Sequence, residues 1–331
     1  MMQLLPVLFM AFFLSVCGGA PPAGEPIEIT IPSGATFGEV VDTLENRGLV
    51  KSPLFFRIYA RLGASDTQVR SGSYAIRPGT KWSTILRDLT EGRVVTVAMT
   101  IPEGFTLRQM KERFSEVTHL SQDSVTSWLA QDSLHGSWSV PGPGLEGYLF
   151  PDTYRFAPGV PLEEVVSAMI QRYRLEWSPE RLSRLAELEM DERELVTLAS
   201  IIQAEARLIE EMPLISAVYH NRLRIGYMLQ ADPTVLYALG GPRERLLYAA
   251  MDSVADHPYN TYTHYGLPPG PICAPGQSAL DAALSPAEVD FLYFVARPDG
   301  SHIFSRTLIE HNRARTQARE ERDRLEREDR D

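Results

Sequence analysis

The chain has 331 residues, a length that predicts two domains. Of these residues 44% are hydrophobic and 9% aromatic, which is enough for a packed core. Its 32 basic and 43 acidic residues leave a net charge of −11. No basic stripe offers a footprint for phosphates, so the sequence argues against nucleic acid as a partner.

The first 20 residues are predicted to be an export signal that stays as a single-pass anchor in the inner membrane. The stretch from Leu4 to Ala20 carries no charge and is near the lower length limit for a membrane-spanning helix. The first basic residue is Arg47, so flanking charges give no orientation. Leu14-Ser-Val-Cys17 loosely resembles a lipoprotein cleavage site, which makes lipidation of Cys17 the less favoured alternative. The rest of the chain is predicted to be soluble and exported.

Residues 27–100 show the alternation of short strands and helices that is typical of a small βα subdomain. Strand patterns are predicted at 27–31, 72–76 and 94–101. Helix patterns are predicted at 36–44, 53–62 and 82–89.

Two segments of this part of the chain echo each other. Ile31-Pro-Ser-Gly-Ala-Thr36 and Ile101-Pro-Glu-Gly-Phe-Thr106 share a strand, a Pro-x-Gly-x-Thr turn and a following helix. This weak repeat resembles the LysM type of glycan-binding module, so we expect a LysM-like subdomain over residues 27–100. The alternative is a β-turn before an N-cap threonine, which explains the proline, glycine and threonine equally well.

Residues 101–315 predict a larger, mainly helical domain, which makes the fold class α+β. Helix patterns lie at 107–114, 161–176, 179–188 and 213–223, and a loop is predicted at 256–276. A short β-hairpin is predicted from Phe291–Ala296 and His302–Phe304, with Asp299-Gly300 between them. Residues 316–331 carry many charges of both signs and are predicted to be a solvated C-terminal tail.

One further helix is predicted from its capping signals. Asp191 is a suitable N-cap and Glu194 follows three positions later, a variant of the capping box. The helical pattern then continues to about Leu208 and includes Glu205.

Glu205 is an acidic residue on the apolar face of this helix, which it shares with Leu198, Ile201 and Ile202. A carboxyl group among apolar neighbours is poorly solvated as an anion, so its pKa is expected to rise. It could then stay protonated near neutral pH, as a general acid requires. The alternative is a structural ion pair with an arginine, for which Arg207, Arg222 and Arg224 are available.

The sequence lacks the signatures of several other chemistries. There is no GxSxG, phosphate loop, GxGxxG or HExxH motif. Neither the two cysteines nor the seven histidines have the spacing of metal ligands, so no metal or cofactor is predicted. Cys273, in a loop, is expected to be inert. What remains is a carboxylate with loops rich in Asn, Tyr, Thr and Gly, which suits carbohydrate chemistry.

Six segments occur in an order that resembles the YceG-like family, the bacterial endolytic murein transglycosylases: Glu146-Gly-Tyr-Leu-Phe-Pro-Asp-Thr-Tyr154, Leu198-Ala-Ser-Ile-Ile-Gln-Ala-Glu205, Asn221-Arg-Leu223, Leu229-Gln-Ala-Asp-Pro-Thr-Val235, Tyr259-Asn-Thr-Tyr262 and Gly266-Leu-Pro-Pro-Gly-Pro-Ile272. The resemblance covers residues 27–315. It implies an N-terminal membrane helix, a LysM-like subdomain and a mixed catalytic domain. It also implies cleavage of nascent peptidoglycan glycan strands within the chain, near the inner membrane, with peptidoglycan synthases as candidate partners.

The resemblance implies that the catalytic residue is a glutamate of the Ala-Ser-Ile-Ile helix. Some members carry a Glu-x-Glu pair there, but here the first position is Gln203, so only Glu205 can serve. Protonated Glu205 would donate to the oxygen between N-acetylmuramic acid and N-acetylglucosamine. It would then take the proton of the muramic C6 hydroxyl, which closes a 1,6-anhydro ring. One carboxylate acts as acid and then as base.

Eleven further side chains are predicted to bind the glycan or to shape the cleft: Glu146, Tyr148, Asp152, Tyr154, Asn221, Arg222, Gln230, Asp232, Thr234, Asn260 and Tyr262. The first four belong to one motif, which either lines the cleft or forms a tight loop capped by Asp152. Gln230, Asp232 and Thr234 either bind acetamido groups or form an Asp-Pro turn.

The remaining members of this set have similar alternatives. Asn260 and Tyr262 either contact sugar or have a structural role. Asn221 and Arg222 are expected to support the cleft, with Arg222 available to tune Glu205. A structural role is favoured for His302 and Asn312.

Two other functions remain open at this point. A glycoside hydrolase would need a second carboxylate near Glu205, for which Asp232 and Asp152 are the candidates. A non-catalytic scaffold would use the N-terminal repeat to bind peptidoglycan and would have no need of an acid on an apolar helix face.

Overall fold

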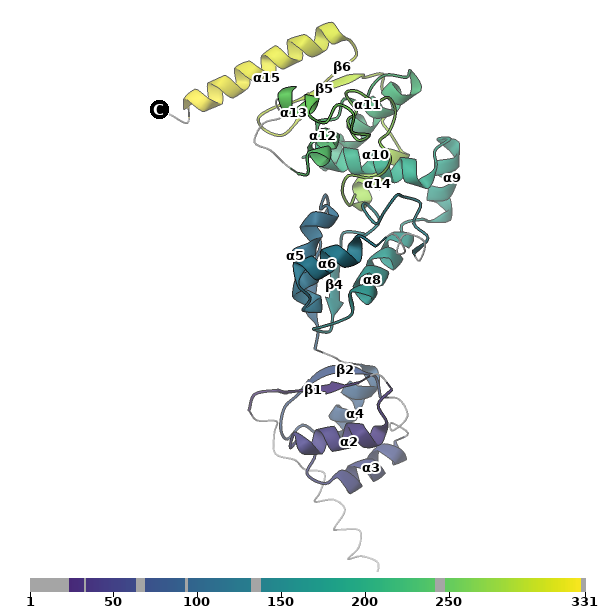
Figure 1. The fold of residues 1–331 in the computed structure, drawn as a ribbon, viewed down its shortest axis with the longest axis vertical. Helices are drawn as coiled ribbons and strands as arrows, with labels where there is room; N and C mark the ends of the chain where they lie inside the picture. Colours follow the sequence, from purple (N-terminus) through teal and green to yellow (C-terminus); the bar gives the residue numbers. More distant parts are fainter. Residues whose placement is uncertain are drawn as a thin grey trace, which may run out of the picture. The chain divides into compact units, whose positions relative to one another are not determined.

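The computed structural model describes residues 24–32, 34–63, 69–92, 95–131, 138–241 and 248–328. The predicted leader, with Cys17, lies outside these ranges. The chain divides into two compact units (Figure 1). The first contains the described residues up to 98 together with 155–160, and the second contains 99–154 and the described residues from 161 onward.

The first unit is a two-stranded antiparallel sheet with three helices, which lie below the sheet in Figure 1. Its elements are β1 (Ile27–Ile31), α2 (Phe37–Asn46), α3 (Pro53–Leu62), β2 (Gly72–Ile76) and α4 (Trp82–Glu91). Apolar and polar residues alternate along β1, so that Ile29 and Ile31 are buried while Glu28 and Thr30 are exposed. The core is completed by aromatic contacts, among them an edge-on pair of Phe56 and Trp82.

The Pro-x-Gly-x-Thr echo has a local explanation. Thr36 and Thr106 are both N-cap residues with full capping boxes, at the starts of α2 and of α5 (Leu107–Thr118). Gly34 and Gly104 both have positive φ, which favours glycine in each turn. The turn-and-N-cap interpretation is therefore confirmed, and the second copy starts a helix of the second unit. The LysM-like character of residues 27–100 stays a prediction.

The second unit is mainly helical with short strands, and the coarse α+β prediction is confirmed. After β3 (Val97–Thr100) and α5, its elements are α6 (Gln122–Leu129), β4 (Thr153–Phe156), α8 (Leu162–Arg174), α9 (Pro179–Glu187), α10 (Glu192–Glu205), the 3-10 helix η1 (Ile209–Glu211), α11 (Met212–Arg224), α12 (Asp232–Ala238), α13 (Tyr248–Asp252), α14 (Gln277–Leu284), β5 (Tyr293–Ala296), β6 (His302–Ser305) and α15 (Leu308–Glu328). β3 pairs with β4, and β5 pairs with β6 in the predicted antiparallel hairpin.

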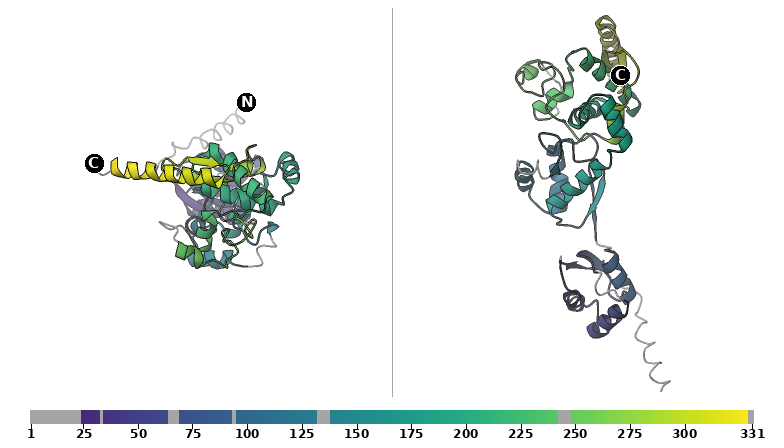
Figure 2. Two further views of the ribbon diagram at one scale, coloured as in Figure 1. Left: turned by 90° about the horizontal axis from the view of Figure 1, so that it is seen from above. Right: turned by 90° about the vertical axis from the view of Figure 1, so that its right-hand side faces the viewer.

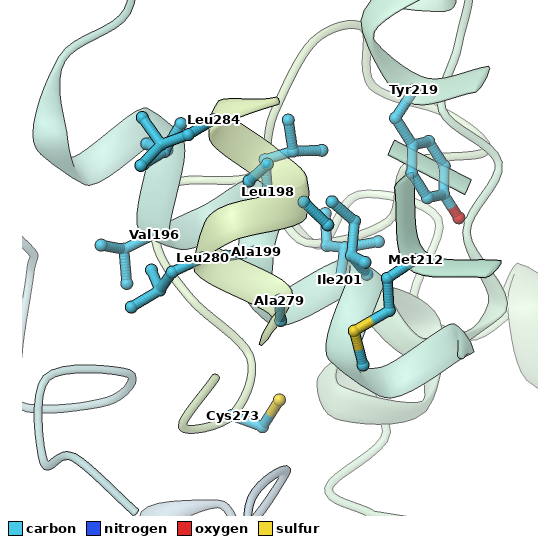
Figure 3. Close-up of a cluster of buried hydrophobic side chains, with 14 of the residues drawn as sticks. Val196, Leu198, Ala199, Ile201, Met212, Tyr219, Cys273, Ala279, Leu280 and Leu284 are labelled. Carbon is cyan, nitrogen blue, oxygen red and sulfur yellow. The ribbon is translucent and has the colours of Figure 1, made fainter. Parts of the chain in front are cut away.

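Helix α10 is the centre of the second unit. All residues from Leu195 to Ile202 are buried, because α14 packs along one side and α11 along another. Figure 3 shows Leu280 and Leu284 of α14 beside Val196 and Leu198 of α10. This packing fixes the axis of the helix that carries Glu205.

Two of the differences from the sequence-based elements concern where an element begins or ends. Helix α10 ends at Glu205 rather than near Leu208, and Ala206 is extended at φ −76° and ψ 128°. No glycine or proline follows Glu205 directly in the sequence, so the helical pattern predicted a helix that continues past its actual end. The strand predicted at 94–101 is confined to β3.

Helix α15 includes most of the predicted C-terminal tail. It extends away from β5 and β6, as the left view in Figure 2 shows, and only Ala314 and Ala318 of it are buried. Within the described ranges, no helix has both the length and the apolar character needed to cross a membrane.

Candidate active site

Glu205 is the last residue of α10, and its side chain is half-buried at the edge of the core. The three apolar residues predicted to share its helix face, Leu198, Ile201 and Ile202, are all fully buried. The hydroxyl of Tyr219 on α11 donates a hydrogen bond of 2.9 Å to Glu205 Oε1. Tyr219 is itself buried, so this bond holds the carboxyl at a defined position.

The surroundings of Glu205 favour its protonated form. The pKa of Glu205 is raised from its ordinary value of 4.5 to about 7. Burial is the largest cause and the negative charge of Asp232 adds to it, while the Tyr219 hydrogen bond and Arg222 lower the pKa. The carboxyl also lies at the C-terminal, negative end of α10, which disfavours a second negative charge there. Near neutral pH the group therefore exists in both forms, as an acid that later acts as a base requires.

The carboxyl faces a cleft of about 710 Å³ in the second unit. The walls come from the ends of α10 and α11, the start of α12, the β5–β6 hairpin and α15, and the lining residues are Glu205, Tyr219, Arg222, Tyr227, Leu229, Gln230, Asp232, Met251, Tyr262, Tyr293, Phe294, Val295, Ala296, His302, Leu308, His311 and Arg315. Of the eleven other predicted site residues, four line this cleft: Arg222, Gln230, Asp232 and Tyr262. Aromatic faces beside hydroxyl, amide and carboxylate groups suit a sugar ligand.

Asp232 and Tyr262 form a hydrogen-bonded pair on one wall. The Tyr262 hydroxyl donates to Asp232 Oδ1 at 2.5 Å. Asp232 is exposed and begins α12, so the predicted Asp-Pro turn is the first turn of a helix. Gln230, two positions before Asp232, is exposed and has φ of +48°, uncommon for a residue other than glycine.

Arg222 supports the cleft without pairing with Glu205. Its guanidinium is buried and donates hydrogen bonds to the carbonyl oxygens of Leu292 at 2.7 Å and Leu229 at 2.6 Å. It thereby joins the end of α11 to the hairpin and to the segment before α12. Among the described residues the carboxyl of Glu205 is hydrogen-bonded to Tyr219, and no ion pair joins it to an arginine.

The remaining predicted residues lie outside the lining of this cleft and have structural partners. Asn221 donates to the carbonyls of Val289 and Phe291. Thr234 and Asn260 are buried, with Thr234 bonded to Ala231 O and Asn260 to Val254 O.

The motif from Glu146 to Tyr154 behaves mostly as the tight-loop alternative. Tyr148 is fully buried in the core, Asp152 accepts from the backbone N–H of Thr153 at 2.7 Å, and the Tyr154 hydroxyl donates to Phe150 O. Asp152 also pairs with Arg172 of α8 at 2.9 Å. These three side chains are therefore not in the cleft of Glu205.

Glu146 lines a different cleft, of about 630 Å³. It accepts hydrogen bonds from Leu107 N at 2.9 Å and from the Tyr237 hydroxyl at 3.3 Å, and so joins the start of α5 to α12. Burial raises its pKa to about 8, against the effect of these bonds and of Arg108. Neighbours in the chain, Ala204 and Glu205, line one of these two clefts each.

A third cleft, of about 1340 Å³, is lined by the first half of α10 and by residues 264–269. Its lining includes neither Glu205 nor Glu146. The described residues contain no group of three or more His, Cys, Asp or Glu side chains arranged to hold a metal ion. Cys273 is free and buried, and burial raises the pKa of its thiol, in keeping with an inert role.

Sequence reasoning missed Tyr219 and Glu211, and it favoured a structural role for His302, which lines the cleft. Tyr219 is 14 positions beyond Glu205, and only the packing of α11 on α10 brings its hydroxyl to the carboxyl. The Tyr219-His-Asn-Arg222 run gave a weak signal, since three polar side chains follow one another in an otherwise apolar helix.

Replacing the two neighbours of Glu205 should shift the pH dependence of activity in opposite directions. Tyr219→Phe removes a hydrogen bond that lowers the pKa of Glu205, so the fall of kcat/KM at high pH should move up by about one pH unit. Asp232→Asn removes a negative charge that raises that pKa, so the same limb should move down. The measurement is the pH profile of kcat/KM on glycan strands; shifts in the same direction would contradict the arrangement.

The chain is similar in sequence to several known proteins. The model of the YceG-like family matches residues 29–317. A Bacillus subtilis protein named endolytic murein transglycosylase is 34% identical over 87% of this chain and 84% of its own length. The protein of the same name from Streptococcus pneumoniae D39 is 31% identical to this chain. The match covers 87% of this chain and 57% of the Streptococcus protein.

The chain belongs to the YceG-like family. A crystal structure of a YceG-like protein from Listeria monocytogenes has the same fold, with a TM-score of 0.61 and 32% identity over 88% of this chain and 99% of that one. The resemblance inferred from the six ordered segments is thus confirmed. One of those segments, Leu198–Glu205, forms the second half of α10.

Proposed function

We propose that this YceG-like chain is an endolytic murein transglycosylase with Glu205 as its catalytic residue. The observation that carries the proposal is a half-buried carboxyl with a pKa of about 7 in a cleft lined by aromatic and hydroxyl-bearing side chains. The names of the Bacillus and Streptococcus relatives support the activity and the murein substrate.

In this proposal the reaction consumes no water. Protonated Glu205 gives its proton to the oxygen between N-acetylmuramic acid and N-acetylglucosamine, and the bond from that oxygen to the muramic C1 breaks. The muramic C6 hydroxyl attacks C1 to form the 1,6-anhydro ring and returns its proton to the Glu205 carboxylate. The catalyst is regenerated, and one group near its pKa performs both transfers.

Several neighbours have roles in this scheme. Tyr219 is a positioning residue, because its hydrogen bond fixes Oε1 and leaves the other carboxyl oxygen for the substrate. Arg222 holds the walls together through backbone carbonyls. Asp232 and Tyr262 present a polar edge that suits acetamido and hydroxyl groups of the glycan.

The setting of the activity is part of the proposal. A murein substrate places the enzyme outside the cytoplasm, at the cell wall. The apolar segment 1–20 is proposed as its anchor in the inner membrane, and the first unit as a LysM-like glycan-binding module. Cleavage of nascent strands would bring peptidoglycan synthases into proximity as partners and would limit strand elongation.

A two-carboxylate hydrolase is the second candidate, since Asp232 is close enough to raise the pKa of Glu205. The mass of the product separates the two functions. Uncrosslinked nascent glycan digested by the wild-type protein should give muramyl ends one water molecule lighter than hydrolysed ends. Ends of hydrolysed mass would replace the transglycosylase with the hydrolase, and intact strands would leave only a binding role.

A further inference from the structure

His302 lines the cleft of Glu205 and has a fixed acidic partner, Glu211, and the scheme above leaves this pair unused. Glu211, at the end of η1, accepts from His302 Nδ1 at 2.7 Å through Oε2 and from the His302 backbone N–H at 3.1 Å through Oε1. The side chains are 3% and 14% exposed for His302 and Glu211. The pair thus ties η1 to β6 across 91 positions of the chain.

The geometry determines which ring nitrogen is available. With the Glu211 carboxylate as acceptor, Nδ1 is the donor of this bond, and in the corresponding neutral tautomer Nε2 is a bare acceptor. Among the described residues Nε2 has no hydrogen-bond partner. It does not belong to the unpartnered polar atoms that are fully buried, so it retains some exposure. It is therefore accessible from the cleft that His302 lines.

The ring is also held in orientation by aromatic neighbours. Phe294 packs edge-on against His302 with centroids 5.3 Å apart, and Phe304 lies at 6.1 Å. Phe294 in turn packs edge-on against Tyr219 at 5.9 Å, and Tyr219 is bonded to Glu205. His302 thus belongs to the same continuous wall as the catalytic carboxyl.

We propose that His302 Nε2 accepts a hydrogen bond from a sugar hydroxyl of the glycan bound beside Glu205, and that Glu211 is the positioning residue that fixes its tautomer. A histidine with a purely structural role would be expected to bond both ring nitrogens within the protein. A saccharide supplies hydroxyl donors in abundance, and a lone acceptor on a rigid wall selects for them. This inference rests on the proposed function, because it takes the occupant of the cleft to be a glycan.

Two substitutions at His302 separate glycan binding from a structural role. Asparagine keeps an N–H near the position of Nδ1 for Glu211 but has nothing at Nε2, whereas glutamine places an amide oxygen near Nε2 and loses the side-chain bond to Glu211. We expect His302→Asn to lower kcat/KM by about tenfold, mainly through KM, and His302→Gln to stay within a few-fold of the wild type. The reverse order, or equal effects, would overturn the proposal.

A third variant leaves the ring in place. Glu211→Gln can donate to Nδ1 and so move the ring proton to Nε2, which would remove the acceptor; we expect a several-fold rise in KM with kcat little changed. An unchanged KM would overturn the role of Glu211. His119→Asn, at the exposed C-cap of α5, is the control and should match the wild type.

Binding of uncleaved strands distinguishes this inference from the proposed function. Nascent, uncrosslinked glycan is titrated onto Glu205→Gln and onto the double variant that also carries His302→Asn. Weaker binding by the double variant supports the inference. If Glu205→Gln still cleaves, the proposed function fails; if it does not cleave and both proteins bind equally, only the inference about His302 fails.

Discussion

Glu205→Gln should lower the rate of anhydromuramic end formation by about 10³–10⁴-fold, at the upper end of what general acid–base catalysis contributes. The amide has nearly the shape of the carboxyl and can still accept from Tyr219, but it can neither give nor take a proton. Because the same group is proposed for both transfers, no second residue replaces it. The measurement is the initial rate of anhydro ends released from nascent glycan, followed by mass spectrometry.

The matched control is Glu210→Gln. Glu210 lies five positions further along in η1, and its side chain is exposed, so the same chemical change there should leave the rate within about twofold. Binding of glycan by Glu205→Gln should persist, since its cleft is unchanged. A Glu205→Gln protein that cleaves at more than a few per cent of the wild-type rate would refute the role of Glu205.

Arg222→Met should destabilise the second unit by about 3–5 kcal/mol, because several charge-assisted hydrogen bonds are lost and the carbonyls they satisfied are left buried. The guanidinium bonds to Leu292 O and Leu229 O, and methionine can fill the space but cannot donate. Urea denaturation gives the free energy of unfolding, and the loss should appear whether or not glycan is present.

Arg224→Met is the control for this stability prediction. Arg224 is exposed, and its hydrogen-bond partner among the described residues is the side chain of Asn221 on its own helix, at 2.8 Å. A bond of that kind contributes about 1 kcal/mol or less. If the two methionine variants lost equal stability, Arg222 would not be the residue that joins α11 to the hairpin and to the Leu229 segment.

The position of Glu205 could be predicted from sequence because helical periodicity is local. Three apolar residues at helical spacing define the face, and burial of that face follows without knowledge of its partner. The end of α10 could not be predicted, since the residues after Glu205 carry no glycine or proline and continue the helical pattern. The chain leaves the helix there to form η1 and α11.

Contacts between distant segments could not be predicted from the sequence. Tyr219 reaches Glu205 through the packing of two helices, and His302 meets Glu211 across 91 positions. The motif that begins at Glu146 contained polar and aromatic residues of the kinds that bind sugars. In the structure Tyr148 lies in the core and Glu146 lines a different cleft. The sequence could not show this, because polar and aromatic residues occur in packed loops as readily as in binding sites.

Glu205 and Glu146 also make the stability of the folded protein depend on pH. In the unfolded chain each would lose its proton near pH 4.5, but the folded protein retains it until about pH 7 and 8, respectively. Their contribution to stability is therefore complete below pH 4.5 and is lost as the pH rises from there through about 7 for Glu205 and about 8 for Glu146. The burial that lets Glu205 transfer protons near neutral pH thus lowers the free energy of unfolding in that same pH range.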